Sequence, residues 1–226
     1  MRIASYNIRK AVGLDWRRDP MRIIRVLEDL DADVVAVQEA DKRLGSRPAV
    51  LPPAQLFDHT GLRILQVTNG PSSGWHGNAI LVRDDWRVTG TKRVSLPGIE
   101  PRGAVRAELS GPDFEISVIG THLGLRRGCR QLQLAHLLEE IGDNTAGTVL
   151  AGDMNEWSPR IGFDLIDDDF DLVRPGLTFH TSRPVAALDR FAVGRGFRCV
   201  GSGVLNAGDA KRASDHLPVW IDLVAA

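Results

Sequence analysis

The chain has 226 residues, 43% hydrophobic and 25% charged, with 28 Lys and Arg against 29 Asp and Glu for a formal net charge of −1. This composition is typical of a folded globular protein, excludes a disordered or fibrous chain, and fits a single domain over residues 1–226. A dedicated duplex-binding protein usually carries a basic excess, and none is present here.

Cysteine usage and hydropathy indicate the cellular compartment. The two cysteines, Cys129 and Cys199, lie far apart and form no C-x-x-C motif, which suits a reducing compartment. The chain enters a strand-like run at Arg2–Ile8 with no apolar leader before it, and no apolar run approaches the roughly 18 residues of a membrane span. We therefore expect a cytoplasmic protein without membrane insertion, and a monomer.

Strand-like and helix-like segments alternate along the chain. After the first strand, Asp19-Pro20 opens a helix, because Asp is a preferred cap and Pro a preferred first-turn residue. Residues 40–75 are broken into loops by Pro and Gly, with one short helix near Ala54–His59. Strands joined by both short turns and helical crossovers imply mixed sheets. The other expected elements are a helix at Gln131–Ile141 and strands at Val34–Val37, Asn78–Arg83, Arg87–Ser95, Ala104–Leu109, Glu115–Thr121, Thr148–Ala151, Leu188–Val193, Cys199–Leu205 and Pro218–Val224.

Polar side chains interrupt the apolar runs at the ends of six predicted strands. Such a side chain is costly there unless it is paired, hydrogen-bonded or metal-bound. A single one is usually an ordinary turn residue, but six are harder to explain in this way. Strand ends of layered α/β folds converge on one crevice, so we expect a shared site. The residues are Asn7, Glu39, His122, Asp153 with Asn155, Asp189, and Asp215 with His216.

The oxygen-bearing members of this set predict a metal site. Glu39 and Asp215 are hard oxygen ligands, and Asn7 can add a neutral oxygen. These groups suit Mg²⁺ or Mn²⁺ rather than Zn²⁺, which prefers clustered Cys and His.

The histidines of the set predict proton transfer. His122 and His216 titrate near neutral pH and can move protons. Asp189 can orient His216, as a carboxylate does in a base–orienter pair.

Six sequence segments hold these residues in a fixed order. They are Ser-Tyr-Asn7-Ile, Val-Gln-Glu39-Ala, Thr-His122-Leu-Gly, Gly-Asp153-Met-Asn155, Leu-Asp189-Arg-Phe and Ser-Asp215-His216-Leu-Pro-Val. Together they resemble the endonuclease/exonuclease/phosphatase superfamily, which includes DNase I, abasic-site endonucleases, bacterial sphingomyelinases and inositol polyphosphate 5-phosphatases. The resemblance spans residues 3–224. The final Ser-Asp-His-Leu-Pro-Val segment together with Gly-Asp-x-Asn is specific, whereas the Asn7 and Glu39 segments are weak alone and useful because of their order. It implies a four-layer α/β/β/α sandwich of two packed mixed β-sheets flanked by helices.

The resemblance also implies a metal-dependent phosphoesterase that uses an activated water. Glu39 would bind Mg²⁺ or Mn²⁺ directly, with Asn7 and Asp215 completing or supporting the site. Asp153 and Asn155 would position the attacking water, with Asp153 a candidate base.

The two histidines receive separate roles from the resemblance. His216, held by Asp189, would act on the nucleophile or stabilise the charged transition state. His122 resembles the histidine of the DNase I and sphingomyelinase branches, which contacts the phosphate or helps the leaving group. Phosphate ester hydrolysis has one of the highest activation barriers known for an uncatalysed reaction. A metal, an oriented water and a proton donor would each lower part of this barrier.

Three further residues are candidate substrate contacts. Arg9 stands where nucleases of the superfamily often carry an acidic residue, which removes a candidate second-metal ligand. Arg9 either clamps a substrate phosphate or lies exposed at a strand end. Asn78 and Arg102 match superfamily positions near the phosphate. Trp157 either walls the pocket and stacks on a base or sugar, or packs in the core.

Two alternatives to this function stay open. Residues 70–74 fit G-x-S-x-G, and Ser72, an Asp and His216 follow the order of an α/β-hydrolase triad, although residues 75–82 predict a loop entering a strand rather than the required helix. The second alternative is a binding module that has the same fold but no catalytic activity. The substrate is a phosphate ester, and the sequence does not decide between nucleic acid, a phospholipid head group and a small phosphorylated molecule, or between diester and monoester.

Overall fold

Two six-stranded β-sheets form the centre of the molecule. The computed structural model describes residues 1–42, 45–112, 115–158 and 161–226. Each sheet has one parallel pair, β1 with β2 and β7 with β8, and its other pairs are antiparallel, so both sheets are mixed as predicted. The strand order of the first sheet is β11 (Phe197–Val204), β12 (Val219–Ala225), β1 (Arg2–Asn7), β2 (Val34–Gln38), β4 (Ala79–Arg83), β3 (Leu62–Ile64). The order of the second is β5 (Arg87–Leu96), β6 (Arg102–Ser110), β7 (Glu115–His122), β8 (Thr148–Asp153), β10 (Asp189–Gly194), β9 (Phe170–Val173).

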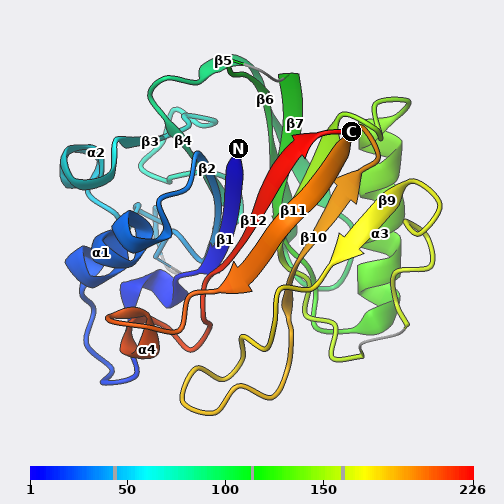
Figure 1. Ribbon diagram of the computed structural model, residues 1–226. Helices are drawn as coiled ribbons and strands as arrows, with labels where there is room; N and C mark the ends of the chain where they lie inside the picture. Colours follow the sequence, from blue (N-terminus) through cyan, green and yellow to red (C-terminus); the bar gives the residue numbers. More distant parts are fainter. Residues whose placement is uncertain (43–44, 113–114, 159–160) are drawn as a thin grey trace.

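Helices cover the outer face of each sheet (Figure 1). On the first sheet lie α1 (Pro20–Leu30), α2 (Pro53–Thr60) and the short α4 (Ala210–Ala213), and on the second lies α3 (Arg127–Ile141). Asp19 caps α1 as expected, because its carboxylate accepts a 3.1 Å hydrogen bond from the Arg22 backbone. The predicted four-layer α/β/β/α sandwich is confirmed.

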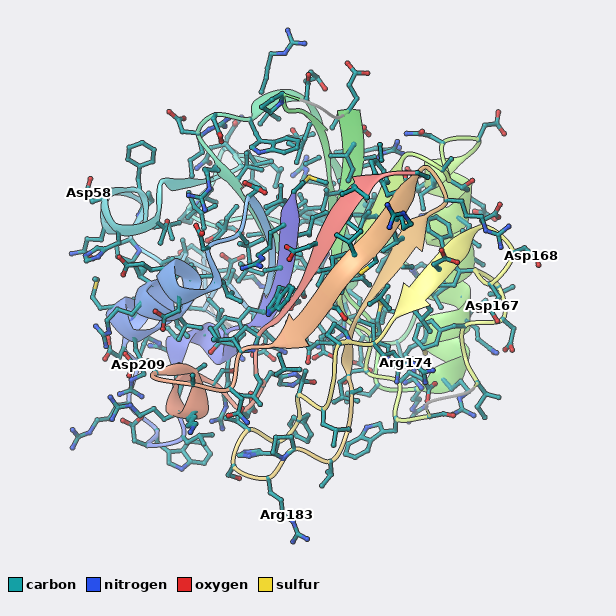
Figure 2. The ribbon with its side chains drawn as sticks, viewed as in Figure 1. Asp58, Asp167, Asp168, Arg174, Arg183 and Asp209 are labelled. Carbon is teal, nitrogen blue, oxygen red and sulfur yellow. The ribbon has the colours of Figure 1, made fainter. Side chains whose placement is uncertain are left out.

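Apolar side chains of the two inner sheet faces form one continuous core. Ile3 and Val34 of the first sheet belong to the same buried cluster as Val118, Val149 and Phe191 of the second. Burial of this apolar surface drives the packing of the two sheets. Charged side chains such as Asp58, Asp167 and Arg183 project from the outside of the molecule (Figure 2). Of the described helices, none has both the length and the apolar character needed to cross a membrane.

The strand register brings three predicted site residues into one row. His122 ends β7 opposite Asp153, which ends β8, and Asp153 also faces Asp189 at the start of β10. Gly152 permits this close pairing, because a Cβ atom there would lie 1.9 Å from the carbonyl oxygen of Thr121. The predicted strands end where the sequence placed them to within a few residues, and the prediction of polar strand ends converging on one edge of the sheet holds for this row.

Candidate active site

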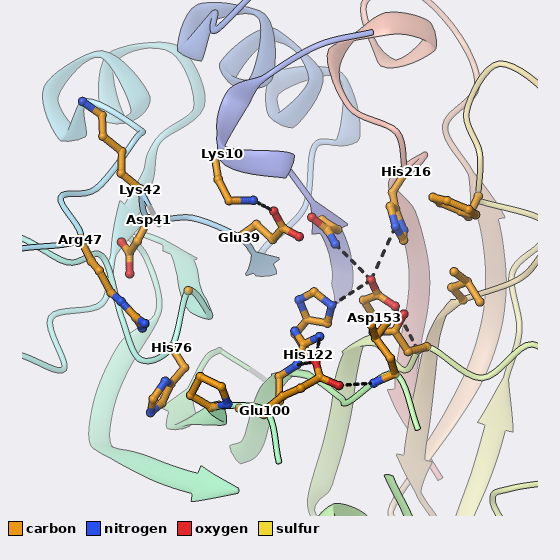
Figure 3. Close-up of a pocket in the computed structure, with 18 of the residues that line it drawn as sticks. Lys10, Glu39, Asp41, Lys42, Arg47, His76, Glu100, His122, Asp153 and His216 are labelled. Atoms are coloured by element: carbon orange, nitrogen blue, oxygen red, sulfur yellow. Dashed lines mark hydrogen bonds and ion pairs between the residues drawn. The ribbon is translucent and has the colours of Figure 1, made fainter. Parts of the chain in front are cut away.

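A pocket of about 550 Å³ lies at the ends of the central strands (Figure 3). The ends of β1, β2, β7 and β8 contribute residues to it, and the loops that follow these and neighbouring strands contribute the rest. The predicted site residues among its lining are Asn7, Glu39, Arg102, His122, Asp153, Asn155 and His216.

The buried carboxylate of Asp153 is the meeting point of the site. Its Oδ2 atom accepts a 3.1 Å hydrogen bond from Nδ2 of Asn7. The same oxygen lies 3.3 Å from Nε2 of His122 and 3.6 Å from Nε2 of His216. Because Asn7 belongs to the first sheet and His122 and Asp153 to the second, this carboxylate joins the two sheets at the floor of the pocket (Figure 3).

His216 lies between two carboxylates. Its Nδ1 is 2.8 Å from Oδ2 of Asp189, and its Nε2 faces Asp153. Burial opposes a charge on the imidazole, but the negative charges of Asp189 and Asp153 outweigh burial and raise the pKa of His216 to about 10. The predicted Asp189–His216 pair is therefore present in the structure, and it holds an imidazolium at neutral pH.

His122 has the opposite protonation state. Its side chain is buried, and burial lowers its pKa to about 4, although Asp153 partly offsets this effect. The pocket therefore combines a neutral imidazole and a charged one on a single carboxylate.

Asn155 closes the loop that follows β8. Its backbone N–H donates to Oδ1 of Asp153 (3.0 Å), and its side-chain amide donates to the carbonyl oxygen of Leu123 (2.8 Å). Asn155 has a φ of 51°, a left-handed conformation that Asn tolerates better than most residues. The Gly-Asp-Met-Asn segment thus fixes Oδ1 of Asp153, while Oδ2 faces Asn7 and the two histidines.

Lys10, which sequence reasoning did not single out, is the ion-pair partner of Glu39. The Lys10 ammonium contacts Oε2 of Glu39, and both side chains line the pocket. The Lys10 backbone N–H also donates to the Glu39 carbonyl oxygen (3.1 Å), so the turn that carries Lys10 is fixed to the end of β2.

Arg9 holds Asp215, and neither residue is among those lining the pocket. Nε of Arg9 lies 3.3 Å from Oδ2 of Asp215, and its guanidinium stacks 4.7 Å above the ring of Trp16. The backbone N–H of Arg9 donates to Oδ1 of Asn7 (3.1 Å). A phosphate clamp at Arg9 and a metal-ligand role for Asp215 stay predictions that this arrangement does not directly support.

The other two candidate substrate contacts differ in position. Arg102 lines the pocket, and its Nη2 donates to Oε2 of Glu100 (2.8 Å). Asn78 is buried outside the lining, with Nδ2 donating to the carbonyl oxygen of Gly103 (2.9 Å). Asn78 thus links the loop before β4 to β6.

An exposed aromatic surface adjoins His216. Trp157 is 60% exposed, so the core-packing alternative for this residue is wrong. The Trp157 ring meets Phe179 edge-on at 6.0 Å between centroids, and Phe179 lies 5.0 Å from the His216 ring. Trp157 and Phe179 both line the pocket. Phe179 carries no motif signal in the sequence, since its position depends on the loop that pairs with residues 215–217.

Loop residues complete the opposite wall of the pocket. Asp41, Lys42, Arg47 and His76 all line it, and the first three come from residues 40–75, for which the sequence predicts only loops and one short helix. His76 lies in the loop before β4 and matches no sequence motif that would have placed it in the pocket. Local composition gives no signal for such residues, because their placement depends on long-range packing of the loop.

The donor groups of the site fit a hard divalent cation. Asp153, Asp189 and His216 each offer one ligating atom, all within 4.8 Å of one another, and so form a candidate metal site. Within this group Nδ1 of His216 already pairs with Asp189, which leaves Nε2 as the imidazole nitrogen that faces Asp153 and the pocket. Glu39 and Asn7 offer oxygens at the pocket surface, and the described lining contains no cysteine, which agrees with Mg²⁺ or Mn²⁺ rather than Zn²⁺.

Ser72 lacks the surroundings of a catalytic serine. Its hydroxyl donates to Oδ2 of Asp41 (2.5 Å), and it lies in an irregular loop rather than between a strand and a helix. Among the described residues no histidine contacts it. A serine hydrolase with Ser72 as nucleophile is therefore not supported.

The chain matches known proteins over nearly its whole length. The model of the endonuclease/exonuclease/phosphatase family matches residues 4–216. The chain belongs to this family. Members of the family are phosphoesterase hydrolases. A 161-residue stretch is 32% identical to the uncharacterized protein YbhP of Escherichia coli strain K12, and covers 66% of this chain and 63% of YbhP.

Solved structures confirm the fold of this family member. An endonuclease/exonuclease/phosphatase from Beutenbergia cavernae superimposes with a TM-score of 0.76 at 21% identity, over 100% of this chain and 72% of that one. The mannosyl-6-phosphatase Bt3783 of Bacteroides thetaiotaomicron gives a TM-score of 0.75 at 19% identity, over 99% of both chains. At these identities the likeness establishes the DNase I-like fold and leaves the substrate open.

Proposed function

We propose that this family member hydrolyses a phosphate ester by attack of water, with Mg²⁺ or Mn²⁺ bound at Glu39 and Asn7. The observation that carries the proposal is the contact of Asn7, His122 and His216 with the single buried carboxylate of Asp153 at the pocket floor. Such a set of groups can bind the phosphate, activate the attacking water and protonate the leaving oxygen at one point, as hydrolysis of a phosphate ester requires.

Each side chain has a role that follows from its protonation state. Asp153, whose Oδ2 faces both imidazoles at the pocket floor, is the acceptor for a proton of the attacking water. His216 carries a positive charge and can stabilise the transition state or donate a proton to the leaving oxygen. His122 is neutral and can hydrogen-bond a phosphate oxygen. A divalent cation, when bound, would supply charge neutralisation on the phosphate oxygens.

Binding of substrate would use the groups that line the pocket walls. Arg102, although paired with Glu100, can donate to a phosphate oxygen from the wall beside His122. The pocket volume of about 550 Å³ suits a small ester or the end of a larger molecule. The proposal covers diesters and monoesters alike, and the B. thetaiotaomicron neighbour is by its name a phosphatase of a sugar phosphate.

The test is hydrolysis with controlled metal content. Plasmid DNA, abasic duplex, RNA, sphingomyelin, bis-p-nitrophenyl phosphate and mannose 6-phosphate are each offered to chelator-treated protein, with and without Mg²⁺ or Mn²⁺. We expect turnover of at least one substrate that is lost after EDTA and returns with metal. Asp153→Ala and His216→Ala should each lower kcat by about 10²-fold or more, on the usual scale of acid–base groups. Undiminished turnover in EDTA would overturn the metal assignment.

A further inference from the structure

A single turn of the chain contacts all three residues that were predicted to hold the metal. The turn Arg9–Ala11 follows β1 directly. Its Lys10 ammonium pairs with Glu39, its Arg9 guanidinium pairs with Asp215, and its Arg9 backbone N–H donates to Oδ1 of Asn7. Two positive charges therefore face the carboxylates to which a divalent cation would bind.

The backbone of this turn is strained, which indicates that its position is imposed by the surrounding structure. Arg9, Lys10 and Ala11 have φ values of 47°, 59° and 59°. Three consecutive non-glycine residues in the left-handed region are rare, because the Cβ atom crowds the following carbonyl oxygen there. Such strain concentrates at functional sites when the surrounding structure fixes it. Here the Lys10 N–H bond to the Glu39 carbonyl oxygen and the Asp19 N–H bond to the Ala11 carbonyl oxygen fix both ends of the turn.

The two basic residues differ in how firmly they are held. The Arg9 guanidinium contacts three groups: the Asp215 carboxylate, the Trp16 ring and the Gly13 carbonyl oxygen. Among the described residues the Lys10 ammonium pairs with Glu39 alone, and both side chains are 28% exposed to solvent. A flexible lysine stem with one partly solvated partner can move, whereas the Arg9 guanidinium is fixed.

We propose that Lys10 is a built-in counterion of Glu39 that a divalent metal displaces, after which the released ammonium faces the substrate phosphate. This inference rests on the proposed function, because it takes Glu39 as the metal ligand. Lys10 neutralises Glu39 when no metal is bound, and so weakens metal binding by competition. Because Lys10 lines the same pocket as His122 and Asp153, its ammonium needs no change of backbone to meet an anionic substrate. Arg9 meanwhile keeps Asp215 neutralised, as a fixed charge in place of a second ion.

The matched variants separate competition for Glu39 from a general change in pocket charge. Lys10→Gln removes the charge and keeps a polar side chain of similar length. Lys10→Arg keeps the charge. Lys42→Gln removes the same charge from another wall of the pocket, where the Lys42 ammonium points away from Glu39 (Figure 3). Glu39→Gln removes the ligand itself.

Mn²⁺ binding to the metal-stripped full chain is measured by electron paramagnetic resonance of the free ion. We expect Lys10→Gln to lower the Kd for Mn²⁺ about fivefold, the scale of one partly exposed ion pair. Lys10→Arg and Lys42→Gln should stay within about twofold of the parent, and Glu39→Gln should raise the Kd at least about tenfold. An unchanged or higher Kd for Lys10→Gln would overturn the proposal. So would an unchanged Kd for Glu39→Gln.

A second readout distinguishes the exchange of Lys10 from a purely structural effect. At saturating Mn²⁺, Lys10→Gln should raise KM for the best substrate of the panel by about fivefold or more, since the phosphate loses a charged partner. Tighter metal binding and weaker substrate binding in one variant are opposite changes, which a partly unfolded protein would not give. An unchanged KM would refute the contact with substrate. The metal titration needs no turnover, so its result stands even if no substrate of the panel is hydrolysed.

Discussion

Nδ1 of His216 lies 2.8 Å from Oδ2 of Asp189, whose side chain is completely buried. This contact leaves Nε2 of His216 as the nitrogen that faces the pocket, because Nδ1 is engaged. Asp189 therefore holds the orientation of His216, and it is not among the described residues that line the pocket. Since Asp189 and Asp153 both favour the charged imidazole, the protonation state of His216 depends on residues of two neighbouring strands, β8 and β10.

Replacing Asp189 by Asn should lower kcat more than it changes KM. The amide keeps the shape of the carboxylate but removes one of the negative charges that raise the pKa of His216, so a smaller fraction of His216 carries a proton at neutral pH. We expect kcat to fall about 10²-fold, with an optimum shifted to lower pH. Steady-state rates from pH 5 to 9 measure both the fall in kcat and the shift of the pH optimum. An unshifted pH profile would show that Asp189 acts only in folding.

The two site histidines should titrate on opposite sides of neutrality. In chelator-treated protein, imidazole proton NMR should show His216 protonated until its pKa of about 10 is approached and His122 neutral until the pH nears 4. The folded-state pKa of His216 is raised, so its contribution to stability is complete below about pH 6.5 and is lost as pH rises toward 10. The pKa of His122 is lowered, so stability falls as pH drops from about 6.5 toward 4. Two coincident titrations near pH 6.5 would contradict the assignment.

Glu156 should be a major acid-sensitive contact of the site's supporting loop. It is buried and pairs with Arg130 (2.6 Å) and Arg127 (3.0 Å). Burial would raise the pKa of Glu156, but these arginines and the Ser158 N–H lower it to about 2. A lowered pKa means that the stability it contributes is present above about pH 4.5 and is lost as pH falls toward 2.

Glu156→Gln tests this contact by denaturant unfolding. We expect a loss of about 3 kcal/mol at pH 7, the scale of breaking a buried ion pair, and a flatter dependence of stability on pH between 4.5 and 2. The matched control is Glu139→Gln on α3, whose carboxylate is mostly exposed and 3.5 Å from His136. Equal effects of the two substitutions would mean that Glu156 has no special role.

The order of elements and the floor of the pocket follow from local sequence signals. A capped helix such as Pro20–Leu30 and an apolar run such as Val34–Gln38 are legible because their pattern repeats over several residues. Asp153 and His216 could be found because a polar group at the end of an apolar strand needs a partner. Short elements such as β3, with three residues, contain too little periodicity to be predicted.

The walls of the pocket could not be predicted in the same way. Lys10 reads as an ordinary strand-end lysine until the left-handed turn brings it to Glu39. Phe179 reaches His216 because its loop pairs with the segment before β12, a contact between residues far apart in the chain. Both placements depend on tertiary packing of loops, which carries no local period.

Trp157 should contribute to binding of substrates with a planar leaving group. Its ring is exposed at the pocket edge and is braced by Phe179, which in turn lies against His216. Stacking on an aromatic ring contributes roughly 1–3 kcal/mol per base, so Trp157→Ala should raise KM about tenfold for an aromatic ester such as bis-p-nitrophenyl phosphate. The KM of an ester with a small aliphatic leaving group should change little. Phe57→Ala is the matched control, because Phe57 is an exposed aromatic residue of α2 outside the pocket lining. Equal KM changes for aromatic and aliphatic esters would rule out stacking and leave Trp157 as a general wall of the pocket.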